Sequence, residues 1–345
     1  MNFEIKQLNG KNEKKWDEFV KKTEFSTFCH QIEWKNIIED TYGLHHNYLF
    51  AENDIGDVVG VLPLFMVKDL FFGRRMVSIP FVPYGGVCCE TDAIGKALID
   101  EAITIGNKFN VDYCELRSTR EQEYTKNFTR ANIYVTSILS LGDTPDSTLQ
   151  NMQRNKRKNV LKSERNDLEI KFLSEDTSIF ADFFDIYSQN SRRLGTPQHS
   201  EDFFKNILKY LHSDIVCVYK NNNYHYCALA IFFKDTVIDY MSSSFMDSRK
   251  YFVTDFGVWN LIKKAHELNY KYFDFGRSVI DSDNLESKRR WGVDTMNLDY
   301  CYPIAQRLNV SKLQPTNYGK SAHVWSKLPL TMTRFLGPRL RKFIV

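Results

Sequence analysis

Apolar residues along the chain follow two periods, one typical of helices and one typical of strands. A spacing of three and four residues is the pattern of an amphipathic helix. It occurs over 13–23, 32–42, 92–109, 180–187 and 255–268. Runs rich in β-branched and aromatic residues predict buried strands. They cover 46–52, 58–67, 111–118, 214–220, 224–233, 236–244 and 271–278. The pattern predicts an α/β protein with mixed sheets.

The order of these elements repeats along the chain. A meander of strands, then a helix, then one more strand occur in the first half and again in the second. Both helix-to-strand units end in an Arg-Ser dipeptide, at Arg117–Ser118 and at Arg277–Ser278. An internal duplication would explain this order, and a chance match is the alternative.

The length of 345 residues exceeds that of a typical single domain and predicts two. We expect an N-terminal domain over 1–142, a C-terminal domain over 143–305 that begins with a basic helix, and a basic amphipathic tail over 306–345. The longest apolar run, 58–67, is too short to cross a bilayer as a helix and is expected to form one buried strand. The N-terminus lacks the apolar core of a secretory signal, so a cytoplasmic protein is expected.

The reactive residues disfavour several classes of enzyme. Seven cysteines include no CxxC pair and eight histidines lack metal-ligand spacing, so we expect buried free thiols, no metal and no bound cofactor. The motifs GxxxxGK[ST], GxGxxG after a strand, HExxH and GxSxG are also missing from the sequence. The sequence therefore argues against P-loop, Rossmann, zinc-protease and serine-hydrolase chemistry.

Positive charge is concentrated in two segments, although the net charge is only +3. The first is a helix that is predicted to start at the cap Thr144 and to continue through six lysines and arginines between residues 154 and 165. Helical geometry puts Arg154, Arg157 and Lys158 on one face, which could hold phosphates or an RNA backbone. The alternative is a solvated face that is balanced by acids elsewhere.

The second basic segment is the tail. The last acidic residue is Asp299, and eight lysines and arginines follow it, interleaved with apolar side chains. An anionic membrane surface or a phosphate-bearing partner fits this pattern. The alternative is a terminal helix that packs on the body with its charges solvated. Pro329 and Gly337 are expected to interrupt any single long helix.

The segment 255–292 is predicted to carry a functional site. Its helix leads into a strand that delivers Asp274, Gly276 and Arg277 to one point, and a loop then brings back the cations that precede Trp291. Charged groups gathered at a strand end are candidates for binding an anion.

A meander, a helix and a strand also form the core of an acyltransferase superfold, in which a splayed sheet binds an activated acyl donor. Its acetyl-CoA version has an [RQ]xxGx[GA] loop at the start of the helix, whose backbone N–H groups hold the pyrophosphate. Residues 248–259 contain only one glycine, Gly257, and it is expected inside the helix. The sequence thus disfavours a standard CoA cradle.

Several motifs resemble those of the FemAB-type family, whose members are built from two tandem GNAT-like acyltransferase domains. FDFGRS (273–278) is followed by KRRWG (288–292) and NLDYCY (297–302), while RNKRKNV (154–160) and SRRLGTP (191–197) precede them. The likeness extends over most of the chain. It implies transfer of an aminoacyl or acyl group onto an amine of a peptidoglycan or polysaccharide precursor. The donor would be aminoacyl-tRNA or acyl-CoA.

The resemblance also indicates catalytic residues. The family usually has Phe-Lys where this chain has Ser287–Lys288, so Lys288 is the leading candidate. Together with Arg277 it would stabilise developing charge or phosphate charge, and Asp274 could orient a cation or the amine. Tyr240 could offer a hydroxyl. The alternatives are a strand-end cap for Asp274 and a buried, hydrogen-bonded ring for Tyr240.

A second group of residues is predicted to bind substrate. It consists of Arg277, Arg289, Trp291, Arg157, Lys158, Arg193 and Tyr84. Trp291 could instead be core, and the loop after Arg193 could be an ordinary turn between helices. The expected partners are a small-molecule, lipid-linked or nucleotide-linked precursor, tRNA, and the inner face of the membrane through the tail. The alternative function is a non-catalytic RNA- or anionic-membrane-binding protein that uses the basic helix and the tail.

Overall fold

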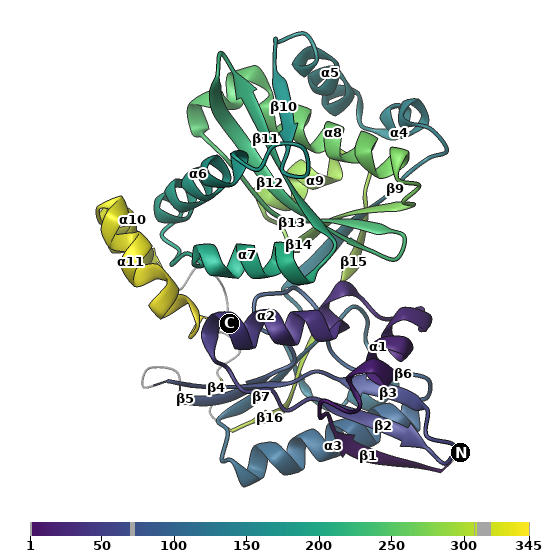
Figure 1. Cartoon of the computed structure of the whole chain (residues 1–345). Helices are drawn as coiled ribbons and strands as arrows, with labels where there is room; N and C mark the ends of the chain where they lie inside the picture. Colours follow the sequence, from purple (N-terminus) through teal and green to yellow (C-terminus); the bar gives the residue numbers. More distant parts are fainter. Residues whose placement is uncertain (1, 70–72, 307, 309–318, 345) are drawn as a thin grey trace. The chain divides into compact units, whose positions relative to one another are not determined.

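The chain forms two compact units in the computed structural model, which describes residues 2–69, 73–306, 308 and 319–344 (Figure 1). The first unit comprises Met1–Tyr134, Met296–Asn317 and Arg341–Val345. The second comprises Val135–Thr295 and Tyr318–Leu340. Both units are therefore assembled from separate stretches of the chain.

The compact units differ from the contiguous domains 1–142 and 143–305 at the strand β16 (Asp299–Ala305), which belongs to the first unit. This strand pairs antiparallel with β7 (Tyr113–Ser118). Its apolar residue Ile304 is buried in the same cluster as Cys114 of β7. Because β16 is buried against β7, it belongs to the first unit, although Val135–Thr295, which precedes it in the sequence, belongs to the second.

The first unit contains a four-stranded and a five-stranded sheet within its described residues. The four-stranded sheet has the order β1-β2-β3-β6 and consists of Phe3–Gln7, Leu49–Asn53, Val58–Leu62 and Cys88–Cys89. The five-stranded sheet has the order β4-β5-β7-β16-β8, in which β4, β5 and β8 are Phe65–Asp69, Gly73–Val77 and Thr129–Arg130. The helices are α1 (Glu13–Lys22), α2 (Ile32–Tyr42) and α3 (Asp92–Lys108), with 3-10 turns at Phe28–His30 and Glu123–Thr125. The helices predicted over 13–23, 32–42 and 92–109 are confirmed.

The apolar run 58–67 forms two strands in different sheets, so the prediction of one strand is wrong. β3 ends at Leu62 and β4 begins at Phe65. Pro63 lies between them, and proline has no N–H to donate to a sheet ladder. The chain therefore leaves one sheet at Pro63 and enters the other.

The second unit is built on a seven-stranded mixed sheet with the order β10-β11-β12-β13-β14-β9-β15. In that order the strands are Glu169–Phe172, Ser213–Lys220, Asn223–Phe233, Thr236–Ser244, Tyr272–Val279, Tyr134–Ser140 and Asp294–Asn297. Its helices include α6 (Ile179–Arg193), α7 (Glu201–Tyr210), α8 (Val253–Glu267) and α9 (Asp283–Arg289), and a 3-10 turn covers Met246–Tyr251. The predicted meander, helix and strand are confirmed here.

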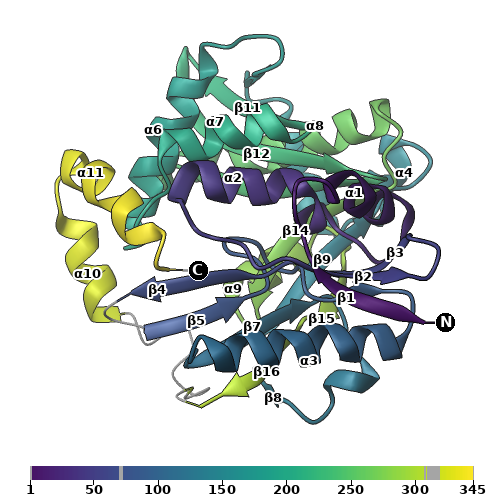
Figure 2. The ribbon, with the colours of Figure 1, turned by 60° about the horizontal axis from the view of Figure 1, so that its bottom comes forward.

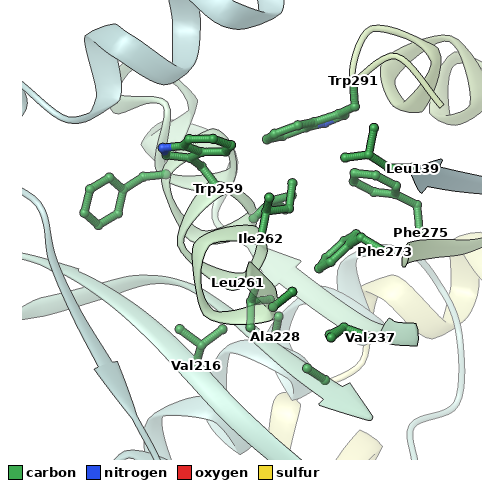
Figure 3. Close-up of a cluster of buried hydrophobic side chains, with 14 of the residues drawn as sticks. Leu139, Val216, Ala228, Val237, Trp259, Leu261, Ile262, Phe273, Phe275 and Trp291 are labelled. Carbon is green, nitrogen blue, oxygen red and sulfur yellow. The ribbon is translucent and has the colours of Figure 1, made fainter. Parts of the chain in front are cut away.

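Helix α8 supplies much of the core of the second unit (Figure 3). Its Leu261 and Ile262 are buried in one cluster with Phe273 of β14. Gly257 lets the helix approach β12, because a Cβ at this position would lie 2.3 Å from the ring of Tyr226. This glycine therefore serves helix packing, and it lies inside α8 as predicted.

Helices α6 and α8 both contact β11 and β12 (Figure 2), and the alternation of side chains assigns them to opposite faces. Val216 and Val218 of β11 belong to the cluster around α8. Between them, Cys217 turns the other way, and its Sγ lies 3.8 Å from the carbonyl oxygen of Ile179 in α6. The sheet is therefore covered on both faces.

The basic helix that was predicted to start at Thr144 is two helices, α4 (Pro145–Asn151) and α5 (Arg154–Ser163). The Thr144 side chain caps α4 as predicted. At the break, the Gln153 N–H donates to the carbonyl oxygen of Arg290 at 3.1 Å. Gly292 packs closely there, since a Cβ would lie 2.8 Å from the carbonyl oxygen of Asn151. A continuous helix is excluded because the loop 290–292 packs against the backbone at the break and accepts a hydrogen bond from the Gln153 N–H.

The tail forms α10 (Gly319–Lys327) and α11 (Leu330–Arg341). The interruption predicted at Pro329 is confirmed, whereas Gly337 lies inside α11, contrary to the prediction. Arg307 and Lys312 of the predicted basic tail lie outside the described residues. Within the described part of the chain, no helix has the length and apolarity needed to span a bilayer.

Candidate active site

The parallel strands β13 and β14 separate at their carboxyl ends. Their ladder covers only Thr236–Ile238 against Tyr272–Asp274. Just beyond it, Tyr240 is an extra residue in β13, because Ala230 of β12 pairs with Asp239 and Leu229 pairs with Met241. Such a bulge bends a strand and redirects its side chains. Polar residues of both strands, Asp239 and Asp274 among them, therefore lie at or just beyond the end of the ladder.

Asp274 shapes the end of β14. Its Oδ1 accepts hydrogen bonds from the Gly276 N–H at 2.7 Å and from the Thr136 hydroxyl at 3.0 Å. Gly276 has a φ of +69°, a left-handed conformation that glycine adopts without strain. The buried Asp274 therefore has the contacts of a strand-end cap, which was the alternative to a catalytic role.

Lys288 is held against the end of β14 by the short helix α9. Ser282 caps this helix, Leu285 is fully buried, and Lys288 follows three residues later on the same side. The Lys288 Nζ donates to the carbonyl oxygens of Gly276 at 2.9 Å and of Arg277 at 3.2 Å. Among the described residues, Lys288 Nζ makes these two hydrogen bonds. An ammonium has three N–H donors, so the third is available to a ligand.

The Lys288 ammonium is in an unusual electrostatic position. The pKa of Lys288 is lowered to about 8, chiefly by burial and in part by the charge of Arg277, while the charges of Asp239 and Asp274 act in the opposite direction. A lysine with such a pKa changes its charge close to neutral pH. Perturbed groups of this kind are concentrated at functional sites.

Asp239 is the functional candidate that the sequence analysis missed. Its Oδ1 is shielded from solvent and has no hydrogen-bond partner among the described residues. Burial raises the pKa of Asp239 to about 6, although the charge of Lys288 and a hydrogen bond from Ser242 counteract this rise. The only signal in the sequence is an acid between apolar residues in the strand TVIDYM. Between about pH 6 and about pH 8, Asp239 and Lys288 are both charged.

Three further predicted residues lie next to these groups in the chain. Tyr240 is half-buried at the bulge, and Arg277 is exposed on β14 beside Gly276. Arg289 is exposed at the end of α9 and forms an ion pair with Glu286. The strand ends thus bring Arg277, Asp274 and Lys288 together, as the sequence predicted.

Trp291 is core and not the wall of an open site. It is 3% exposed and packs against Phe275, with ring centroids 5.6 Å apart (Figure 3). The Lys156 Nζ lies 4.7 Å from the centre of the Trp291 ring and 2.5 Å from Asp255 Oδ1. The alternative, that Trp291 is part of the core, therefore describes it better than a role in binding substrate, because the ring is enclosed by its neighbours.

The basic helix α5 keeps part of its predicted face. Lys156 points inward to Asp255, whereas Arg154 and Lys158 are exposed. Arg157 is half-buried and donates from Nη1 to the carbonyl oxygen of Gln150 at 3.2 Å. Arg154, Arg157 and Lys158 therefore remain candidates for binding a polyanion, while Lys156 is structural.

Arg193 and Tyr84 have local partners. Arg193 is exposed at the end of α6 and donates to Asn190 Oδ1 at 2.6 Å, and the described residues show no contact between it and Lys288. Tyr84 belongs to the first unit, where its buried ring packs edge-on against Phe28 at 6.5 Å. The ring is part of the core, so a role in binding substrate stays a prediction without a structural contact behind it.

The first unit has a similar pair of parallel strands, β5 and β7, joined through α3. Beyond the ladder, the buried Arg117 donates from Nε to Glu115 Oε1 at 2.5 Å and from Nη1 to the carbonyl oxygens of Ile79 and Val82, each at 3.0 Å. The Tyr302 hydroxyl donates to Glu115 Oε2 at 2.8 Å. Arg117 is thus consumed by internal contacts.

Replacing Arg117 with methionine is expected to lower the free energy of unfolding by about 3–5 kcal/mol, because the carboxylate of Glu115 stays buried without its cation. Urea denaturation measures this change. Adding Glu115→Gln to the variant removes the uncompensated charge and is expected to restore part of the stability. A loss below about 1 kcal/mol for Arg117→Met would contradict the importance of this network.

The start of α8 does not have the features of a CoA cradle. Phe252 precedes the helix with a φ of +59°, and the first turn contains the buried Asp255. A carboxylate in the first turn already interacts with the helix dipole and with Lys156. The backbone N–H groups here are therefore not presented by a glycine loop to a pyrophosphate.

Part of the second unit is similar to a known domain family. Residues 147–285 match the family model described as an acetyltransferase (GNAT) domain, which includes Asp239, Asp274 and Arg277 and ends three residues before Lys288. No curated protein matches the chain.

Solved structures have the same fold over most of the chain. A structure titled FemX is 14% identical, with a TM-score of 0.66 over 86% of this chain and 97% of that one. A tandem GNAT protein from the clavulanic acid biosynthesis pathway is 9% identical, with a TM-score of 0.56 over 87% and 98%. The C-terminal domain of a putative lysylphosphatidylglycerol synthetase from Agrobacterium fabrum is 10% identical, with a TM-score of 0.54 over 95% and 97%. The predicted fold of two tandem GNAT-like domains is confirmed.

Proposed function

We propose that this chain, a tandem GNAT-fold acyltransferase with its GNAT domain in residues 147–285, uses the opening between β13 and β14 to transfer an aminoacyl group from an ester onto an amine. One observation carries the proposal: at the end of the β13–β14 ladder, the Asp239 carboxyl, whose Oδ1 is shielded from solvent, and the largely buried Lys288 ammonium are near enough to interact electrostatically. Each of the two charges shifts the pKa of the other group toward the charged form. A base and a cation are therefore available together near neutral pH.

The proposed reaction needs both groups. The amine nitrogen of the acceptor forms a bond to the ester carbonyl carbon, and the bond between that carbon and the leaving oxygen breaks. Asp239 takes the proton that the amine loses and returns it to the leaving oxygen. The remaining N–H of Lys288 donates to the carbonyl oxygen as negative charge develops on it.

An aminoacyl-tRNA donor is supported by the surroundings of α8. Its first turn lacks a glycine loop and contains Asp255, which weakens the case for the pyrophosphate of CoA. Helix α5 packs beside α8 and exposes Arg154 and Lys158, which suit a chain of phosphates. The acceptor is proposed to be the amine of a cell-envelope or polysaccharide precursor, as the family resemblance implies.

The test is product formation from defined donors. The full chain is incubated with charged total tRNA or with acyl-CoA, together with peptide and amino-sugar acceptors that carry a free amine, and mass spectrometry detects the acylated product. Product that depends on charged tRNA and is lost in Lys288→Met is expected. Product from acyl-CoA alone would overturn the choice of donor, and no product from either donor would overturn the proposal.

The competing function is a non-catalytic RNA-binding protein, and the exposed cations of α5 favour it. That function predicts salt-dependent RNA binding that is the same for charged and uncharged tRNA. Filter binding of both forms, followed over time for loss of the aminoacyl group in the presence of acceptor, separates the two. Deacylation that requires the acceptor supports transfer, and equal binding without turnover supports the RNA-binding function.

A further inference from the structure

Helix α11, near the C-terminus of the chain (Figure 1), exposes several large apolar side chains and buries two small residues. Thr333 and Gly337, one turn apart, are buried. Met332, Phe335 and Leu340 are 46%, 62% and 39% exposed. At 100° per residue Phe335 lies about 160° from both Thr333 and Gly337, and Met332 lies about 100° and about 140° from them, whereas Leu340 falls near their side of the helix. A helix that only packed on the body would have the reverse arrangement.

The orientation of α11 is fixed by specific contacts within the second unit. A Cβ on Gly337 would lie 2.9 Å from the side chain of Gln198, so only glycine lets the helix come this close. Arg334 Nη2 donates to Asp185 Oδ1 of α6 at 2.6 Å. The exposed apolar arc is therefore a stable property of the fold and not the result of a loosely attached helix.

The preceding helix is fixed in the same way and contributes a similar surface. Gly195 approaches the backbone of Ala322, since a Cβ at Gly195 would lie 2.4 Å from the Ala322 carbonyl oxygen. Arg192 donates from Nη1 to the carbonyl oxygen of Leu328 at 3.2 Å. On the exposed side of α10, Val324 is 63% exposed and Lys327 follows three residues later. The loop SRRLGTP therefore holds the C-terminal helices in place.

The charged side chains of α10 and α11 themselves are all of one sign. Arg339 lies on the apolar arc, with its guanidinium 3.9 Å from the centre of the Phe335 ring. Arg334 is neutralised by Asp185, whereas Arg339 and Lys327 are exposed. The sequence contains no acidic residue after Asp299. An apolar surface whose own exposed charges are cationic is complementary to a layer whose surface is anionic and whose interior is apolar.

We propose that the exposed face of α10 and α11, defined by Val324, Lys327, Met332, Phe335 and Arg339, docks the protein on an anionic phospholipid bilayer. Phe335 and Met332 enter the boundary between headgroups and acyl chains, and Arg339 and Lys327 contact lipid phosphates. A second copy of this chain is a poorer fit, because the same face would bring like charges together. Docking would place the enzyme where lipid-linked amines are found.

Vesicle co-sedimentation of the full chain tests the proposal. Vesicles of phosphatidylcholine with about 30 mol% phosphatidylglycerol are expected to bind the protein about tenfold more tightly than phosphatidylcholine alone, and about 0.5 M salt should weaken this binding. The double substitution Met332→Ser with Phe335→Ser is expected to lower the affinity by about tenfold or more. Arg339→Glu should have a similar effect through charge.

Ile55→Ser is the matched control, because Ile55 is an 83% exposed apolar residue of the first unit. It should bind vesicles like the wild type. Equal binding to neutral and anionic vesicles, or unchanged binding of the double variant, would overturn the proposal. So would self-association in analytical ultracentrifugation that the double substitution abolishes, without vesicle binding. The assay contains no donor or acceptor, so its outcome is independent of the proposed transfer reaction.

Discussion

Replacing Lys288 with methionine is expected to reduce kcat for aminoacyl transfer by about 100- to 1,000-fold, the usual loss when one oxyanion donor is removed. The substitution deletes the N–H that would contact the carbonyl oxygen, along with the hydrogen bonds to Gly276 and Arg277. Steady-state rates with saturating donor and acceptor measure the effect. Lys288→Arg keeps a cation and should recover part of the rate.

Lys271→Met is the control for this variant, because Lys271 directly precedes the other end of β14 and is exposed. It removes the same charge without reaching the strand opening and should leave kcat within about twofold of the wild type. A Lys288→Met enzyme that also stays within twofold would show that the ammonium is not used in the transition state.

The second large effect is expected for Asp239→Asn, which should lower the rate by about 100-fold and change the pH profile. The wild-type rate should rise through about pH 6 as Asp239 loses its proton and fall through about pH 8 as Lys288 loses its own. The two apparent pKa values read from these limbs belong to the coupled Asp239–Lys288 pair and not to either residue alone. In Asp239→Asn the acid limb should disappear.

The alkaline limb gives the sharper outcome. The negative charge of Asp239 raises the pKa of Lys288, so its removal should shift the alkaline limb to lower pH. Rates between pH 5 and about pH 9, measured for both enzymes, test this. An alkaline limb that moves upward, or an acid limb that survives in Asp239→Asn, would contradict the assigned roles.

Sequence patterns predicted the second unit well, because its helices and strands are long and strongly periodic. They failed where one residue decides the geometry. Pro63 divides an apolar run between two sheets, and the loop around Gly292 interrupts the helix that follows Thr144. Pro63 acts through an N–H that it lacks, whereas the N–H of Gln153 finds its partner in the distant Arg290 carbonyl, and apolar periodicity contains information about neither.

The candidate site was predicted in part for the same reason. Lys288 and Arg277 could be located because both belong to recognisable motifs near one strand end. Asp239 lies on a different strand, and its proximity to Lys288 depends on the parallel pairing of β13 with β14. Trp291 illustrates the reverse error, since a motif residue beside a functional lysine can be buried as core.

The position of β16 has a consequence for the order in which the chain folds. In the five-stranded sheet β16 lies between β7 and β8, although it follows them by more than 160 residues. During synthesis, β7 therefore leaves the ribosome with an unpaired edge that stays exposed until Asp299–Ala305 emerges. The seven-stranded sheet is completed by then. Chaperone binding to nascent chains should accordingly concentrate on the first 134 residues, even though they are made first.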